Sequence, residues 1–182
     1  MIQETLPKHL DVKALAQAAG ALAGQDLLSK YGRLMQETQG LGAENRLAWS
    51  ARAELRTDAV GAEQVWLHLT IEALLPLTCQ RCLRPADIAV LVNRSFRFVG
   101  SEDAAEAQDA EAEEDVLALS DSFSLPELIE DEVLMALPLV PRHDSCPVKV
   151  KLAVADPDFD AALQEQRQPF SVLAQLKKSK AD

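Results

Sequence analysis

The sequence predicts an α+β protein in which helices pack on an antiparallel β-sheet meander. Three segments that alternate between apolar and polar residues follow one another within residues 45–99, joined by short turns, which is typical of neighbouring antiparallel strands. Segments with apolar residues at helical spacing flank them on both sides. The 182 residues fit one domain with a sizeable core, which we place at residues 1–155, followed by a mobile C-terminal tail at residues 156–182.

Two helices are predicted before the strands. Asp11 can cap the first, over residues 11–19, where apolar residues recur on one side. The second is predicted over residues 26–37, although Gly32 lies in its interior. Gly20 and Gly24 interrupt the segment between the two predicted helices.

Three strands are predicted over residues 45–55, 64–75 and 87–99. The first two present regular apolar faces, made of Leu47, Trp49, Ala51, Ala53 and Leu55 and of Val65, Leu67, Leu69 and Ile71. The third begins with an apolar face at Ile88, and we expect its phase to change through Arg94. A short edge strand is expected over residues 115–119.

A run of acidic residues interrupts the sheet. Residues 102–115 hold eight acidic residues and no basic one, and the chain as a whole carries a net charge of -11, which normally repels nucleic acid. Because this segment has few apolar residues and a high charge, we expect a disordered, solvated loop over residues 101–115. The alternative is an acidic arm that mimics phosphate or shields a basic partner.

The strongest helix signal begins at Ser124, which forms a capping box with Glu127. Apolar residues then recur on one side up to Leu137, Pro138 ends the helix, and Pro141 keeps the exit extended. The polar side carries three acids, which we interpret as a solvated face that a partner can contact: Glu130, Asp131 and Glu132.

The predicted tail contains a short amphipathic helix with a basic end. Phe170, Leu173 and Leu176 recur every three residues, and Lys177 and Lys178 follow them. This helix either packs on its own domain or is presented to a partner.

Three cysteines and one histidine are the leading candidates for chemistry. Cys79 and Cys82 lie in a predicted strand-to-strand turn, and His143 and Cys146 follow the proline-containing exit with the same spacing. Together they would supply a tetrahedral Cys3His set for one structural zinc ion. Two alternatives remain open: thiols that pack as small hydrophobic groups, and a dithiol redox pair. The redox pair lacks the helix N-terminus that usually lowers the thiol pKa.

Arginines on and after the cysteine turn predict an RNA-binding surface. Arg81, Arg84, Arg94 and Arg97 can contact phosphate groups, and the phenylalanines that alternate with Arg97 can stack on bases. In the alternative, the arginines balance nearby acids and the phenylalanines belong to the core.

Composition and motifs disfavour several classes of protein. No apolar run approaches the roughly 18 residues of a membrane helix, and the N-terminus lacks the features of a signal peptide. With an odd number of cysteines, these features predict a cytoplasmic protein without a disulfide framework. The sequence contains no nucleophile elbow, phosphate-binding loop or zinc-protease motif, so we predict no enzymatic activity and no small-molecule substrate.

Three stretches together resemble one family. They are residues 77–82 (LTCQRC), 129–144 (IEDEVLMALPLVPRHD) and 169–177 (PFSVLAQLK). In order and spacing they are similar to the YceD family, bacterial proteins associated with accumulation of large-subunit ribosomal RNA. Some relatives carry further C-terminal cysteines in patterns like a zinc ribbon, whereas this chain has only His143 and Cys146 there.

The resemblance implies a non-enzymatic role in the synthesis, processing or stability of 23S rRNA. The expected partners are the large-subunit rRNA, a large-subunit ribosomal protein, or both, and in bacteria the family's gene commonly neighbours that of such a ribosomal protein. Two alternatives remain: a zinc-stapled thiol redox protein, and a protein-docking module that makes no RNA contact.

Overall fold

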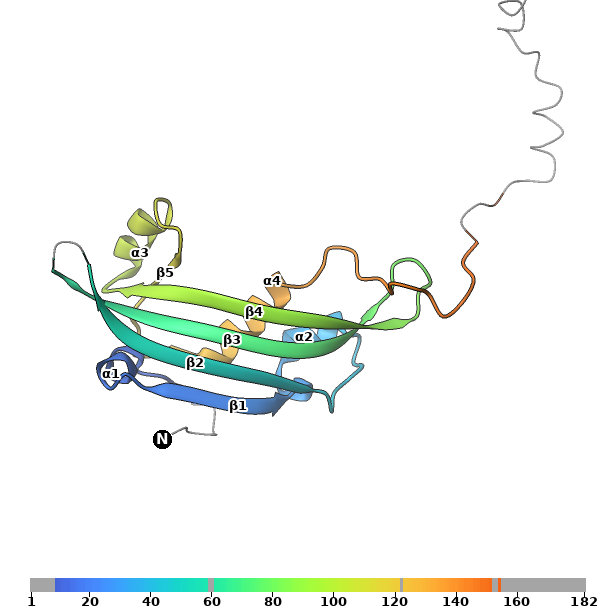
Figure 1. The fold of residues 1–182 in the computed structure, drawn as a ribbon, viewed down its shortest axis with the longest axis horizontal. Helices are drawn as coiled ribbons and strands as arrows, with labels where there is room; N and C mark the ends of the chain where they lie inside the picture. Colours follow the sequence, from blue (N-terminus) through green and yellow to red (C-terminus); the bar gives the residue numbers. More distant parts are fainter. Residues whose placement is uncertain (1–8, 59–60, 122, 152–153, 155–182) are drawn as a thin grey trace, which may run out of the picture. The chain divides into compact units, whose positions relative to one another are not determined.

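The computed structural model describes residues 9–58, 61–121, 123–151 and 154. The described chain up to Cys146 forms one compact unit, and the described residues from Pro147 onward belong to a second. The first unit contains a five-stranded sheet of order β1-β2-β3-β4-β5 together with helices (Figure 1). The α+β class is therefore confirmed. The tail helix predicted within residues 156–182 lies outside the described residues.

The sheet is a meander of long strands closed by a short one. β2 (Arg46–Thr57), β3 (Glu63–Thr78) and β4 (Pro85–Val99) pair antiparallel in chain order, as their alternation predicts. β1 (Ala21–Leu27) pairs antiparallel with β2, and β5 (Asp115–Ala118) pairs parallel with β4. The predicted edge strand is thus present.

The predicted helix over residues 26–37 is wrong in its first part, because β1 extends to Leu27. Tertiary contacts favour the strand here. The Asp26 carboxylate accepts a hydrogen bond from Trp49 Nε1 at 2.8 Å, and a Cβ atom at Gly24 would lie only 2.8 Å from the Trp49 ring. A single helical turn, η1 (Leu28–Lys30), and the helix α2 (Gly32–Glu37) follow.

The pairing of β3 with β4 is regular from Val65↔Phe98 to Thr78↔Pro85. The predicted change of phase through Arg94 is therefore wrong, because alternate residues of β4 remain on one face throughout. Phe96 and Phe98 are 1% and 4% exposed and belong to the core, so the core alternative holds for both rings.

The acidic segment is ordered rather than disordered, since residues 102–109 form α3 (Glu102–Asp109). Ser101 caps this helix by accepting a hydrogen bond from the backbone N–H of Ala104. Arg97 of β4 donates to Gln108 at 2.7 Å and to Glu114 at 2.5 Å, which neutralises part of the acidic charge. The prediction of a loop failed because it counted the local charge without this cation from the neighbouring strand.

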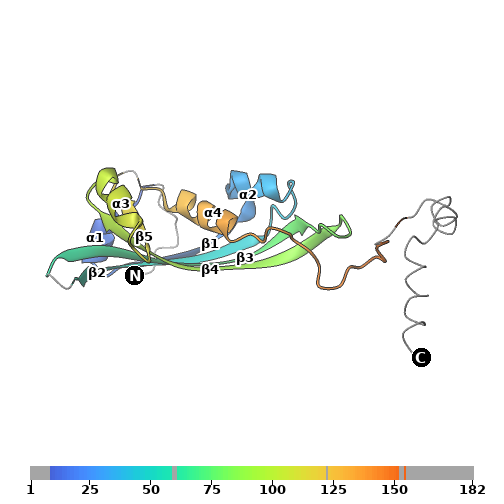
Figure 2. The same cartoon turned by 90° about the horizontal axis from the view of Figure 1, so that it is seen from above.

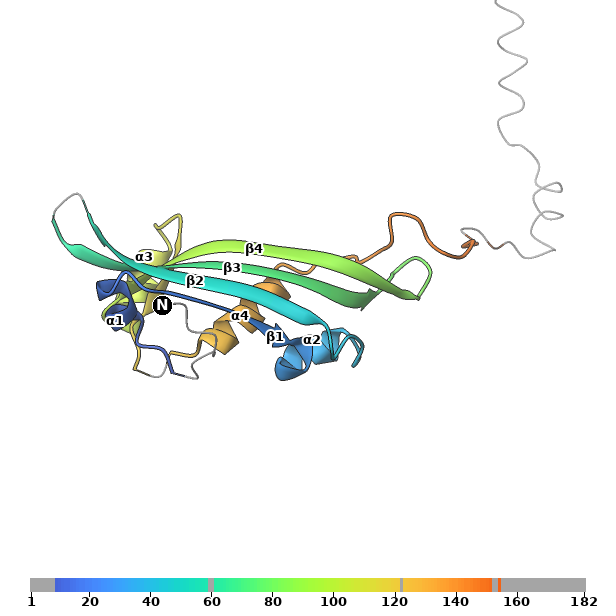
Figure 3. The same ribbon diagram turned by 60° about the horizontal axis from the view of Figure 1, so that its bottom comes forward.

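The core lies between the sheet and three helices. α1 (Val12–Gln17) begins at the cap Asp11 and α4 (Leu125–Met135) at the cap Ser124, as predicted. Figure 2 and Figure 3 show α1, α2 and α4 on the same side of the sheet, where alternate strand residues are buried. Among the helices within the described residues, none is both long and apolar enough to cross a membrane.

Candidate metal centre

Two segments that are distant in sequence meet at one end of the sheet. The turn between β3 and β4 carries Cys79 and Cys82, and the chain that leaves α4 carries His143 and Cys146. Figure 1 shows this chain passing beside the turn. The backbone N–H of Gln80 donates to the carbonyl of Pro141 at 2.8 Å and ties the two segments together.

The four predicted ligand side chains converge on one point. One ligand atom from each lies within 4.8 Å of the others, with Cys79 buried and the other three half-buried. The Sγ atoms of Cys79 and Cys146 are 3.9 Å apart, and Cys82 Sγ lies 3.4 Å from His143 Nδ1. In a tetrahedral zinc site with Zn–S bonds near 2.3 Å, neighbouring ligand atoms lie about 3.8 Å apart. Donor set and spacing therefore fit a four-coordinate metal ion.

The turn between the strands is tightly closed. The backbone N–H of Cys79 donates to the carbonyl of Arg84, and that of Leu83 donates to the carbonyl of Cys79, both at 2.9 Å. Leu83 adopts a left-handed backbone conformation with φ of 58°. This conformation reverses the chain directly after Cys82 and keeps both cysteines in the turn.

Hydrogen bonds around the sulfur atoms favour one thiolate over the other. Burial acts to raise the pKa of Cys79, but backbone N–H groups of His143, Arg81 and Cys82 donate to its sulfur and bring the pKa down to about 5. Burial raises the pKa of Cys82. Because the thiolate is the form that binds a metal ion, the lowered pKa of Cys79 favours metal binding by this side chain.

Arg81 holds the second ligand segment in place. Its Nε donates to Cys146 Sγ at 3.0 Å, and its terminal nitrogen donates to the carbonyls of His143 at 2.8 Å and Asp144 at 3.3 Å. The bond to the sulfur raises the pKa of Arg81. A residue predicted to contact RNA thus also orients two of the four ligands.

Arg81→Ala is expected to weaken metal binding roughly 10- to 100-fold, because outer hydrogen bonds orient metal ligands. Competition with a chromophoric chelator measures the affinity. Arg84 is exposed at the same turn, and Arg84→Ala is the matched control, with an expected change of about twofold or less. Equal losses in both variants would show that Arg81 acts only through its charge.

Arg94 and Arg97 lie toward the other end of β4 and do not cluster with Arg81 and Arg84. Arg94 forms an ion pair with Asp115, and its Nε lies 3.9 Å from Glu132 Oε2. Arg97 is only 9% exposed and is held by its hydrogen bonds to α3 and the following loop. Both arginines balance nearby acids.

The three acids of α4 have different surroundings. Glu130 is buried, and its carboxylate accepts from the backbone N–H groups of Arg33 and Leu34 at 2.7 and 3.1 Å. Asp131 pairs with the Arg33 guanidinium and is half exposed. Glu132 is also buried, and burial raises its pKa. Of the three, Asp131 is the one that a partner can readily reach.

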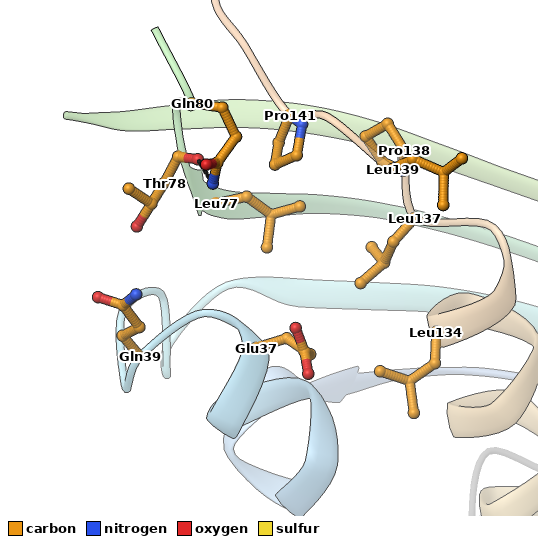
Figure 4. A pocket seen from close by; sticks show the side chains of 10 residues that line it. All are labelled: Glu37, Gln39, Leu77, Thr78, Gln80, Leu134, Leu137, Pro138, Leu139 and Pro141. Carbon is orange, nitrogen blue, oxygen red and sulfur yellow. Dashed lines mark hydrogen bonds between the residues drawn. The ribbon is translucent and has the colours of Figure 1, made fainter. Parts of the chain in front are cut away.

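A pocket of about 550 Å³ lies beside the place where the β3–β4 turn meets the chain after α4, which we call the corner (Figure 4). This pocket was not expected from the sequence. Its lining combines six apolar residues with four polar ones: Leu77, Leu134, Leu137, Pro138, Leu139 and Pro141, and Glu37, Gln39, Thr78 and Gln80. The sequence offers one indication of this pocket. The apolar residues Leu139 and Val140 follow Pro138, where the helix is predicted to end and no core face is predicted. The proposed tail contacts Phe170, Leu173, Leu176, Lys177 and Lys178 lie outside the described residues.

Fold and site together define a class: a small α+β protein in which a Cys3His group that could hold a metal ion lies where the β3–β4 turn meets the chain after α4. The chain belongs to the YceD family, whose model, described as "Large ribosomal RNA subunit accumulation protein YceD", matches residues 67–177. That range contains all four candidate ligands, so the resemblance drawn from the sequence is confirmed. No solved structure matches the chain.

Proposed function

We propose that this chain promotes the accumulation of large-subunit rRNA by binding the rRNA, a large-subunit ribosomal protein, or both, without catalysing a reaction. The family description supports the link to that RNA. The convergence of four candidate protein ligands is the observation that supports a role without catalysis. Structural zinc sites have four protein ligands, whereas catalytic sites keep a position open for water or substrate.

We infer that the metal is zinc. Thiolate and imidazole ligands suit zinc, whereas magnesium and calcium prefer oxygen ligands. Cys79, Cys82, His143 and Cys146 would hold the ion and thereby fasten the chain after α4 to the β3–β4 turn. This fastening would keep the corner rigid for a partner.

A thiol redox function has weaker support. Reactive cysteines of dithiol oxidoreductases usually lie at a helix N-terminus. Here Cys79 follows β3, and the chain leads from the turn into β4. The third thiol, of Cys146, also lies within 3.9 Å of Cys79, which fits a metal cluster better than a two-thiol pair.

Deletion of the gene in its own bacterium tests the proposal. We expect the ratio of large- to small-subunit rRNA to fall, and a plasmid copy of the wild-type gene to restore it. A variant with Cys82→Ser, produced at equal level, should restore it poorly if the rigid corner is required. An unchanged rRNA ratio in the deletion strain would contradict the proposed function.

A further inference from the structure

Exposed apolar side chains occur on the segments next to the candidate metal centre. They belong to the loop after α2, the cysteine turn, the last residue of α4 and the chain that follows it: Leu41, Leu83, Met135, Leu139 and Val140. Leu139 is fully exposed. Because exposure of apolar side chains to water is unfavourable, these residues are candidates for contact with a partner.

One of these exposed residues, Leu139, lines the pocket, and the walls of the pocket come from separate elements. Figure 4 shows Leu77 of β3, Leu134 of α4, Leu137 just after α4, and Glu37 of α2 around one space. Its volume of about 550 Å³ is large enough for one or two apolar side chains of a bound peptide.

The walls of the pocket are held in fixed positions. The hydrogen bond from Gln80 to Pro141 joins the β3 wall to the wall formed by the chain after α4. Glu130 joins α4 to α2 through its bonds to the backbone of Arg33 and Leu34. A rigid pocket binds a partner with little loss of conformational entropy.

The charge in the pocket lining favours a basic protein over RNA, because Glu37 is the one charged residue that lines the pocket. An acidic, apolar surface attracts a segment that combines an apolar anchor with lysine or arginine. Phosphate groups would be repelled by Glu37, and the nearby Arg81 already donates to the ligand segment.

We propose that this pocket is the docking site for a short segment of a basic protein, which inserts an apolar side chain between Leu77, Leu134 and Leu137 and places a lysine or arginine beside Glu37. This inference rests on the proposed function and assigns the class of partner at this corner. The metal centre fixes one wall of the pocket, so ligand variants should also weaken docking.

Photo-crosslinking in living cells tests the docking site. A benzophenone amino acid in place of Leu139 is expected to crosslink to a basic large-subunit ribosomal protein, identified by mass spectrometry. The same probe in place of Ser50, exposed on β2, is the positional control and should not give that product. Crosslinks from position 139 to RNA or to a second copy of the chain would overturn the proposal.

A charge reversal at the pocket provides a second test of the docking site. Glu37→Lys should abolish the crosslink from position 139, whereas Glu44→Lys, an equal charge change at another exposed acid, should leave it intact. A retained crosslink in the Glu37→Lys protein would refute docking at this pocket. This result is separate from the deletion experiment, because the rRNA ratio can depend on the gene even when the partner binds elsewhere.

Discussion

Cys79→Ser is expected to abolish tight zinc binding and to release the chain after α4 from the β3–β4 turn. A serine hydroxyl does not replace a thiolate ligand, and structural zinc contributes roughly 10–16 kcal/mol of apparent binding free energy in zinc-finger peptides. The sheet should stay folded, because its core residues Leu67, Leu69 and Ile71 are fully buried and lie away from the turn.

Hydrogen exchange and native mass spectrometry measure this outcome together. Amides of residues 79–84 and 142–146 should exchange faster in Cys79→Ser, while those of β2 and β3 remain protected. Ser145→Ala alters an exposed neighbour of the ligands and is the matched control. A Cys79→Ser protein that keeps one zinc ion and wild-type exchange would rule out the four-ligand site.

Glu130→Ala is expected to lower the free energy of unfolding by about 3 kcal/mol. Tyr31 precedes α2 without capping it by its side chain, and the Glu130 carboxylate accepts from the second and third N–H groups of that helix instead. It also pairs with the Arg33 guanidinium at 3.0 Å. Removing the carboxylate leaves the buried N–H of Leu34 without its acceptor.

Thermal unfolding measures this loss as a fall in Tm of about 6–12 °C for a domain of this size. Asp131→Ala removes the neighbouring, half-exposed partner of the same arginine and should cost only about 0.5 kcal/mol. Glu130→Gln keeps one acceptor oxygen and should fall between the two. Equal small effects of Glu130→Ala and Asp131→Ala would show that Glu130 does not cap α2.

The elements that the sequence predicted well are those whose own residues show the alternation or the capping side chain. β2 alternates along its predicted part and β3 alternates up to Ile71, and α1 and α4 begin at side-chain caps that the sequence displays. β1 was missed because its buried polar residue, Asp26, is stabilised by Trp49 from another strand. α3 was missed for a similar reason, since Arg97 supplies its balancing charge from β4.

The candidate site, too, was predictable only in part. Residue types, spacing and the proline-containing exit suggested that Cys79, Cys82, His143 and Cys146 form one set, and the structure brings them together. The role of Arg81 was not predictable, because its acceptors include two backbone carbonyls whose position depends on the folded chain. The pocket likewise exists only once α2, β3 and the exit from α4 are assembled.

The zinc content of the full chain, purified under reducing conditions, tests the central claim most directly. Elemental analysis should find one zinc ion per chain in the wild-type protein. The Cys79→Ser protein should contain none. Less than about a tenth of an equivalent in the wild-type protein would contradict the zinc-held corner, because structural zinc sites bind tightly enough to survive purification.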